Sequence, residues 1–294
     1  MFIIHLLNHY KNKMPISDSD ISTLINNDKY KISTEFDSDY FNRYNSSYYL
    51  FNACKSGNET AVRFLLEHGA DMKIKDMDNR ILLSSACENG NIDLVKYLVH
   101  LGADINNENN YGVIHIFNAC KSGNLELVKY LIKQGLDIHK ESITGYTPMF
   151  HACYSGNLNL VKYLIELGLD INKESNRGKI PLFQACYEGH INVVKYLVER
   201  GTNINIEDRN GTTVLYRTCR SKNINLVKYL VEQGLDINKE DIYGYTPLFD
   251  ACLKGYIHMV EYLFENGAEI NKQSYDGRTP LFDACEKGNF DIVK

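Results

Sequence analysis

The sequence lacks the features that mark membrane proteins and nucleic-acid-binding proteins. No stretch approaches the roughly 18 consecutive apolar residues of a membrane-spanning helix. The apolar residues 1–7 have no basic leader and no small-residue cleavage site, so we expect no signal peptide and no membrane partner. Basic residues are outnumbered, with 32 Lys and Arg against 37 Asp and Glu and a formal net charge of −5. Since a nucleic-acid interface usually needs a basic patch, we expect no nucleic-acid partner.

Cysteine is absent from the chain except in one periodic column. Its members stand 33 residues apart, at Cys54, Cys87, Cys120, Cys153, Cys186, Cys219, Cys252 and Cys285. Thiols strung along a line do not converge on one point, so we expect no metal site. Equivalent cysteines on stacked helices would stand ~8–10 Å apart, whereas a disulfide needs α-carbons within roughly 7 Å. We therefore interpret the thiols as packing groups of a protein located in the cytoplasm or the nucleus.

Glycine follows the same period. The twenty glycines fall into three columns, which begin at Gly57, Gly69 and Gly112. The first two columns stand where short helices would end in a left-handed residue, and the third lies in polar turn sequence. Each 33-residue unit is therefore expected to contain two helices and a turn.

The starts of the two helices also have sequence signals. Thr147-Pro148 supplies an N-cap oxygen followed by a proline at the first helical position. The same pair recurs at Thr246-Pro247 and Thr279-Pro280. A run such as residues 158–165 places its apolar side chains on one face of the second helix. Because so short a helix pair cannot enclose a core, neighbouring units must stack on one another.

These repeated phrases resemble the ankyrin repeat in order and spacing. In one central unit they read Gly145-Tyr146-Thr147-Pro148-Met149, Ala152-Cys153, Gly156-Asn157, Leu160-Val161-Lys162-Tyr163-Leu164 and Gly168-Leu169-Asp170-Ile171-Asn172. The resemblance covers roughly 250 residues. It implies an all-α repeat solenoid of stacked helix-turn-helix units, with β-turn or hairpin fingers along one edge. It also implies a role in binding other proteins without catalysis.

We expect two regions along the chain. Residues 1–42 fit no unit and are expected to form an N-terminal helical cap or a poorly ordered extension. Residues 43–294 are expected to form the repeat array, with seven full repeats and a truncated eighth, because the sequence stops within a second helix. Natural arrays normally finish with a polar capping repeat, so this ending leads us to expect a fragment of a longer protein.

Two departures from the ankyrin pattern predict local differences. Phenylalanine stands where the family usually has a histidine that bonds the turn to the helix, at Phe150, Phe183, Phe249 and Phe282. We expect aromatic packing to replace that hydrogen bond. Lys222 stands where glycine is expected, and a left-handed lysine would cost on the order of 1 kcal/mol. We therefore predict a weak point in the stack at Lys222.

A periodic column of lysines offers a ridge that could track phosphates. Its members are Lys96, Lys129, Lys162, Lys195 and Lys228. Glu166, Glu199 and Glu232 follow the last three of them by four residues. We expect i,i+4 ion pairs that neutralise the ridge, and hence a solvated outer face and not a nucleic-acid site.

The candidate binding residues are unusual residues in the columns through which ankyrin repeats bind, the turn tips and the exposed side of the first helix. They are Tyr146, Tyr154, Arg177, Lys179, Tyr187, Arg209, Arg217, Arg220, Tyr243 and Tyr245. Tyrosine and arginine often anchor interfaces, because they combine large contact area with directed hydrogen bonds. We predict a concave groove that accepts an acidic or extended segment of another protein. The alternative is that these columns vary freely, without a binding role.

We expect a monomeric, non-catalytic protein-interaction module. The sequence holds no nucleophile–base pair, no phosphate-cradling glycine loop and no metal cluster, so we expect neither an enzyme nor a cofactor. His151 stands close to Cys153 but has no orienting acid, and we interpret it as an incidental surface histidine. Two alternatives stay open: a structural spacer or scaffold, and the recognition part of a larger adaptor or enzyme whose effector domain lies beyond residue 294.

Overall fold

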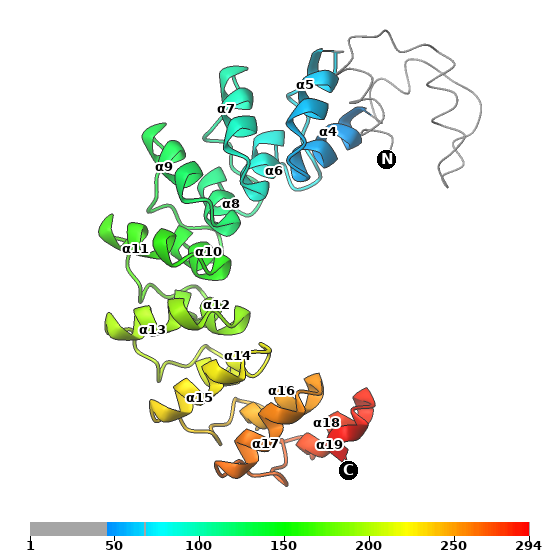
Figure 1. Cartoon of the computed structure of the whole chain (residues 1–294), viewed down its shortest axis with the longest axis vertical. Coiled ribbons are helices and arrows are strands. Elements are labelled where there is room, and N and C mark those ends of the chain that lie inside the picture. Colours follow the sequence, from blue (N-terminus) through cyan, green and yellow to red (C-terminus); the bar gives the residue numbers. More distant parts are fainter. Residues whose placement is uncertain (1–45, 68, 294) are drawn as a thin grey trace, which may run out of the picture. The chain divides into compact units, whose positions relative to one another are not determined.

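The chain folds into a series of short helix pairs (Figure 1). The computed structural model describes residues 46–67 and 69–293, so the cap predicted for residues 1–42 lies outside the described residues. Within the described ranges the chain forms sixteen helices. The strand pairing there is limited to two isolated antiparallel bridges, Lys75 with Ile81 and Glu207 with Thr213. The fold is an all-α repeat solenoid in which turns, and not sheets, separate the helix pairs.

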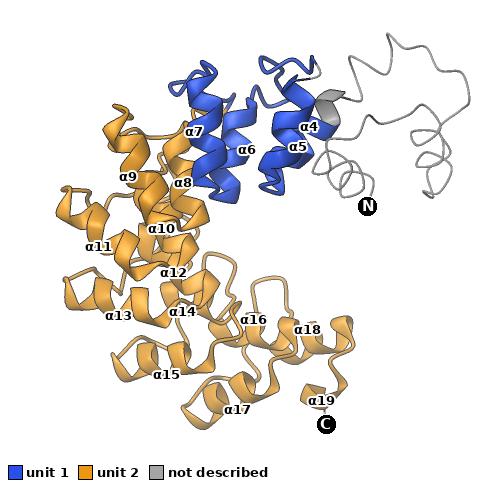
Figure 2. Cartoon of the chain, turned by 45° about the horizontal axis from the view of Figure 1, so that its top comes forward, with its two compact units in different colours: residues 1–110 blue, residues 111–294 orange. Residues whose placement is uncertain are grey.

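The structure divides into two compact units, which Figure 2 colours separately. Unit 1 ends at Asn110 and contains α4 (Ser46–Lys55), α5 (Glu59–Glu67), α6 (Leu82–Asn89) and α7 (Ile92–His100). Unit 2 begins at Tyr111 and contains α8 (His115–Ser122), α9 (Leu125–Lys133), α10 (Pro148–Ser155), α11 (Leu158–Glu166), α12 (Pro181–Glu188), α13 (Ile191–Glu199), α14 (Val214–Thr218), α15 (Ile224–Glu232), α16 (Pro247–Lys254), α17 (Ile257–Glu265), α18 (Pro280–Lys287) and α19 (Phe290–Val293). None of these helices is both long enough and apolar enough to cross a bilayer.

A tight turn precedes the first helix of each pair in unit 2, at the place predicted for the fingers. Before α10, the Ser142 N–H donates to the Tyr146 carbonyl over 2.9 Å and closes the turn. The next turn is tied to this one, because the Asn176 N–H donates to the Thr144 carbonyl over 3.0 Å. Each turn is therefore held both by its own backbone bond and by its neighbour.

Asparagine side chains connect second helices to the preceding helix pair. Asn157 caps α11, since its Oδ1 accepts from the Leu160 N–H (3.1 Å), while its Nδ2 donates to the Gly123 carbonyl (2.7 Å). Asn223 caps α15 in the same way and donates to the Gly189 carbonyl over 2.8 Å. One side chain thus starts a helix and ties two successive pairs together.

The Thr-Pro starts are confirmed as helix starts, but their hydrogen bonds differ from the prediction. Thr279 Oγ1 accepts from the Phe282 N–H over 3.2 Å, as an N-cap should. Thr147 and Thr246 occupy the same position before α10 and α16 but make no cap bond, and their buried Oγ1 atoms have no partner. The predicted N-cap oxygen is therefore wrong at these two sites. A proline at the first helical position leaves one fewer N–H to satisfy there.

The cysteine column lies in the packed interior. Cys54 through Cys252 are buried, and Cys285 in α18 is exposed. All eight are free thiols. Burial raises the pKa of the Cys186 thiol to about 12, so that thiol stays protonated and apolar in character. The prediction of a packing role is confirmed for the seven buried members.

Aromatic packing replaces the turn-to-helix hydrogen bond at two of the phenylalanines. Phe150 meets Tyr146 edge-on with ring centroids 4.6 Å apart, and Phe249 meets Tyr245 edge-on at 4.9 Å. Such edge-to-face pairs are favourable beyond the area that they bury. Each pair joins the finger residue to the helix that follows it, which confirms the expected substitution at these positions.

The weak point predicted at Lys222 has a different origin. Lys222 does not adopt a positive φ, and Asn79 is the one non-glycine residue that does so in the described ranges. Instead, α14 ends at Thr218, and the chain leaves the helix before it reaches Lys222. The predicted left-handed lysine is therefore wrong, because a shortened helix removes the need for that conformation.

The lysine column pairs with tyrosine rings and not with the predicted glutamates. Lys162 Nζ lies 5.2 Å from the ring centroid of Tyr196, one helix pair further along. The contact recurs between Lys195 and Tyr229 and between Lys228 and Tyr262. Among the described residues these three lysines form no ion pair with the glutamates four residues later, so the i,i+4 prediction is wrong. The reason is that stacking brings a ring above each lysine.

Candidate protein-binding face

All ten candidate residues belong to unit 2. There the first helices of the pairs form one row and the second helices another, and the row of first helices follows the inner side of the unit's curve (Figure 2). The candidates lie on α10, α12 and α14 of that inner row, in the turn after α14, and on the fingers that precede its helices. We call the surface made by the inner row of helices and these fingers the inner face.

Five candidates on the inner face are exposed. They are Tyr154, Arg177, Tyr187, Arg209 and Tyr243. Tyr187 is 44% exposed and Tyr243 is 55% exposed, so about half of each residue's surface remains available for contact with another molecule. The Lys121 ammonium lies 5.6 Å from the ring of Tyr154 and steadies it.

Three basic candidates are paired with buried carboxylates. Arg217 Nη2 lies 3.3 Å from Asp208 Oδ2, and Lys179 Nζ lies 3.9 Å from the same oxygen. Arg220 Nε donates to Asp250 Oδ2 over 2.7 Å. Both aspartate side chains are almost fully buried, whereas the cations remain partly exposed. The carboxylates therefore hold the cations in fixed positions and neutralise part of their charge.

Asp208 also shapes the finger on which it lies. Its Oδ1 accepts from the backbone N–H groups of Asn210 (2.9 Å) and Thr212 (3.1 Å). The same side chain thus folds the turn and positions Arg217, which comes from α14. The hydrogen bonds that Asp208 accepts offset the cost of burying its carboxylate.

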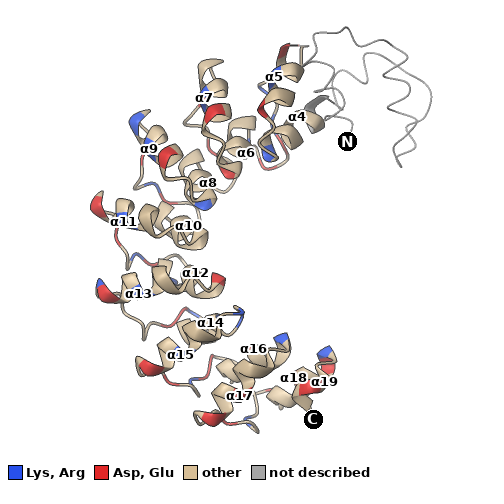
Figure 3. Cartoon of the chain, in the orientation of Figure 1, with Lys and Arg blue, Asp and Glu red and all other residues tan. Residues whose placement is uncertain are grey.

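The local field is positive around Lys179. Burial lowers the pKa of Lys179, and the nearby Arg217 lowers it further, whereas Asp208 opposes the shift. Burial raises the pKa of Asp250 in spite of its bond to Arg220. Basic groups gather before and within α14, where Asp208 is buried among them, and the buried acids Asp250 and Asp283 follow on α16 and α18. Figure 3 shows the basic residues at the end of α14 and charges of both signs on α18.

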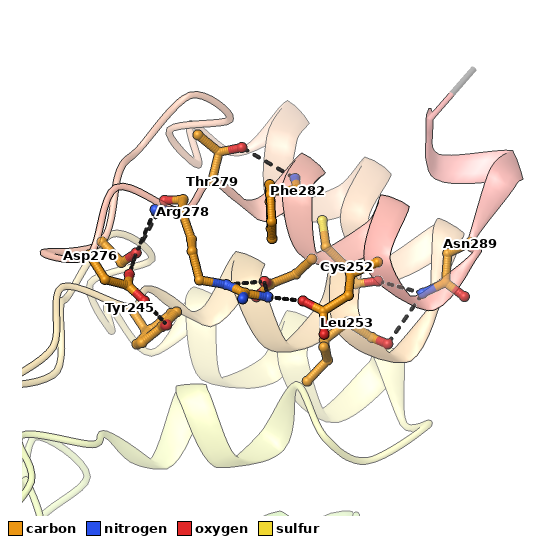
Figure 4. Close-up of polar contacts among 11 residues, drawn as sticks. Tyr245, Cys252, Leu253, Asp276, Arg278, Thr279, Phe282 and Asn289 are labelled. Atoms are coloured by element: carbon orange, nitrogen blue, oxygen red, sulfur yellow. Dashed lines mark hydrogen bonds and ion pairs between the residues drawn. The ribbon is translucent and has the colours of Figure 1, made fainter.

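The remaining two candidates pack within the protein. Tyr146 and Tyr245 are half-buried and lie against Phe150 and Phe249. The Tyr245 hydroxyl also donates to Asp276 Oδ2 over 3.4 Å (Figure 4). Their rings support the fingers and leave only part of their surface for a partner.

His151 is not the surface residue predicted from the sequence. It is half-buried, and its ring meets Phe117 edge-on at 5.2 Å. Burial lowers its pKa to about 4, and Lys121 adds to the shift. The interpretation was wrong because Phe117 of the neighbouring helix α8 packs against a position that looks exposed on α10 alone.

Sequence reasoning missed the acidic side of the inner face. Asp250 and Asp283 stand 33 residues apart, at the position that Arg217 occupies in the preceding unit. Arg278 donates to Asp283 Oδ1 from Nε (2.9 Å) and also pairs with Glu286 (Figure 4). The signal was present as a period-33 acid on the first helix. The pairing of Asp250 with Arg220 of the preceding unit could not be read from one unit.

The residues described by the structure offer no cluster of three or more histidine, cysteine, aspartate or glutamate side chains that could hold a metal ion. The geometry is that of a stacked helical scaffold with a varied inner face. A family model described as ankyrin repeats (3 copies) matches residues 21–109, 116–208 and 200–274, and the chain belongs to the ankyrin repeat family. No curated protein matches the chain. Ankyrin repeats are generally protein-interaction modules and are typically non-catalytic.

Proposed function

We propose that this chain binds a partner protein through the inner face of unit 2 and has no catalytic role. The observation that carries the proposal is the combination of exposed tyrosines with cations that buried carboxylates hold in place, as at Tyr187 and Arg220. Side chains that are fixed before binding lose little entropy in the complex, which favours affinity.

The proposed partner presents an extended or acidic segment. Arg177 and Arg209 are exposed on neighbouring fingers, and their backbones are joined by a hydrogen bond from the Arg209 N–H to the Arg177 carbonyl (2.9 Å). Two guanidinium groups presented side by side suit carboxylates of a peptide. The inner cations favour a protein over nucleic acid as partner, because Lys179, Arg217 and Arg220 already have carboxylate neighbours. The free thiols support a site of action in the cytoplasm or nucleus.

Selection from a displayed random peptide library tests the proposal. The inner variant carries Tyr154→Ser, Arg177→Ser, Tyr187→Ser and Arg209→Ser, which removes exposed side chains and leaves every buried carboxylate paired. The outer control carries Glu166→Ser, Glu199→Ser and Glu232→Ser on exposed positions of the second helices. Circular dichroism establishes that all three proteins are folded.

Peptides selected on the unmodified chain are expected to bind the outer control equally and the inner variant at least about tenfold more weakly, which corresponds to ~1.4 kcal/mol. Enrichment of aspartate and glutamate in those peptides is expected as well. Equal binding to all three proteins would exclude the inner face as the binding site and would favour the spacer role.

A further inference from the structure

A pocket of about 240 Å³ opens on the inner face where the turn after α14 meets α16 and α18. It is lined by Tyr216, Arg220, Tyr245, Phe249, Asp250, Leu253, Arg278 and Asp283. We propose that this pocket receives one tyrosine side chain of the partner segment. The inference rests on the proposed function and adds to it the identity of an anchoring residue.

The pocket lies where the repeat pattern is broken. Because α14 ends at Thr218, Arg220 leaves the helix and crosses to Asp250 in the next helix pair. Tyr216 stands at the position that Phe183 and Phe249 occupy in neighbouring units. Both Tyr216 and Arg220 are in the lining. Two departures from the pattern in this unit thus lie together at one cavity.

The charges in the lining cancel, which favours an uncharged guest. Arg220 Nε lies 2.7 Å from Asp250 Oδ2, and Arg278 Nη2 lies 2.5 Å from Asp283 Oδ1. Within the lining, Asp250 neutralises Arg220 and Asp283 neutralises Arg278, which also pairs with Glu286 outside the lining. A guest with a charge would lose its hydration without gaining an unpaired counter-ion, and that loss can exceed the Coulombic gain.

The size and walls of the pocket favour a single aromatic ring. Its volume is below the roughly 300 Å³ at which pockets for drug-sized ligands begin, so it suits one side chain. The rings of Tyr216, Tyr245 and Phe249 and the aliphatic Leu253 supply apolar contact. The guanidinium groups add planar surfaces that stack on rings, as Arg278 already does at 4.5 Å from the ring centroid of Phe282.

The two aspartates supply the polar contact that selects a phenol over a plain phenyl ring. Arg220 uses Asp250 Oδ2, and Arg278 uses Asp283 Oδ1. Among the described residues no donor bonds the other oxygen of either carboxylate, Asp250 Oδ1 or Asp283 Oδ2. A tyrosine hydroxyl can donate to such an oxygen, and phenylalanine cannot. A charge-assisted hydrogen bond of this kind is among the stronger ones available in an interface.

Titration of small probes into the isotope-labelled full chain, followed by NMR, tests the inference. The probes are the N-acetyl amides of tyrosine, phenylalanine, aspartate and arginine. N-acetyl-tyrosinamide is expected to shift the backbone signals of Leu253 and its neighbours with a dissociation constant on the order of 1 mM. The phenylalanine amide is expected to bind about tenfold more weakly, and the two charged amides more weakly still.

Leu253→Trp provides a variant that fills the pocket from a half-exposed position. Glu88→Trp in α6 is the matched control, because Glu88 holds the equivalent half-exposed position five units earlier and lies outside the pocket. The filled variant is expected to lose at least about tenfold in affinity for the tyrosine amide, and the control is expected to keep it.

Three results would overturn the inference: no binding of the tyrosine amide, binding of the aspartate or arginine amide at least as tight, or unchanged binding to Leu253→Trp. None of these would affect the peptide selection described above, because that experiment reads out Tyr154, Arg177, Tyr187 and Arg209. Failure of the pocket and failure of the proposed function are therefore separate outcomes.

Discussion

The outer and inner rows of helices in unit 2 share the 33-residue period but differ in how far their side chains repeat with it. On the outer row, one contact recurs without change, with Lys162, Lys195 and Lys228 each lying over a tyrosine of the next helix pair. On the inner row, equivalent positions carry His151, Arg217 and Asp250. Identical contacts give a regular scaffold, and varied side chains on that scaffold give a surface with local charge and shape.

The largest expected effect comes from breaking an inner ion pair. Arg220→Ala leaves the buried Asp250 carboxylate without its partner and is expected to destabilise unit 2 by about 2–3 kcal/mol, which is less than for a fully buried pair because Arg220 is partly exposed. Urea denaturation followed by circular dichroism measures the change. The double variant Arg220→Met with Asp250→Leu is expected to recover most of it. A double variant as unstable as the single one would contradict the assigned pairing.

His151, on α10 of the inner row, predicts that the free energy of unfolding depends on pH. Its folded pKa of about 4 lies below its ordinary value of 6.5, so the unfolded chain binds the proton first as pH falls. Stability is therefore fully present above about pH 6.5 and is lost as the pH falls toward 4, by at most ~3 kcal/mol from this group. His151→Gln, which copies the residue at position 184, is expected to flatten the difference in unfolding free energy between pH 7 and pH 4.5. An unchanged slope would show that His151 is not the responsible group.

A comparison of Gly189 with Lys222 sharpens the contrast between a regular and an irregular unit. Gly189 ends α12 with φ of 79°, so Gly189→Lys is expected to cost about 1–2 kcal/mol. Lys222 has no positive φ, and Lys222→Gly is expected to change stability by less than about 0.5 kcal/mol. Thermal unfolding of the two variants measures both values. A gain near 1 kcal/mol from Lys222→Gly would restore the interpretation of Lys222 as a strained, left-handed residue.

The smallest expected effect tests the outer contacts. A double-mutant cycle between Lys162 and Tyr196, using Lys162→Met and Tyr196→Leu, is expected to give a coupling of about 0.5 kcal/mol. The matched cycle between Lys162 and Glu166 is expected to give a coupling near zero, because no ion pair joins these two residues in the described structure. Reversed magnitudes would favour the i,i+4 pairing expected from the sequence.

Much of the architecture could be predicted from the sequence because it depends on local chemistry repeated many times. The glycine columns, the Thr-Pro starts and the burial of the cysteines follow from backbone conformation and periodic apolar faces. The predicted N-cap oxygens at Thr147 and Thr246 were wrong, since those hydroxyls are buried without partners. The positions of the exposed candidates Tyr187 and Arg209 could be predicted from their columns alone. The carboxylates that hold Lys179, Arg217 and Arg220 could not be predicted in this way.

The sequence by itself determined the period, the helix pairs, the packing role of the thiols and membership of a stacked-repeat class, because each of these arises within one unit or from repetition of that unit. Only the tertiary structure decided which side chains meet between units. It paired Lys162 with Tyr196 and Arg220 with Asp250. These partners belong to successive helix pairs, and their distances depend on how one helix pair packs on the next and on where α14 ends. The period along the chain does not contain that information.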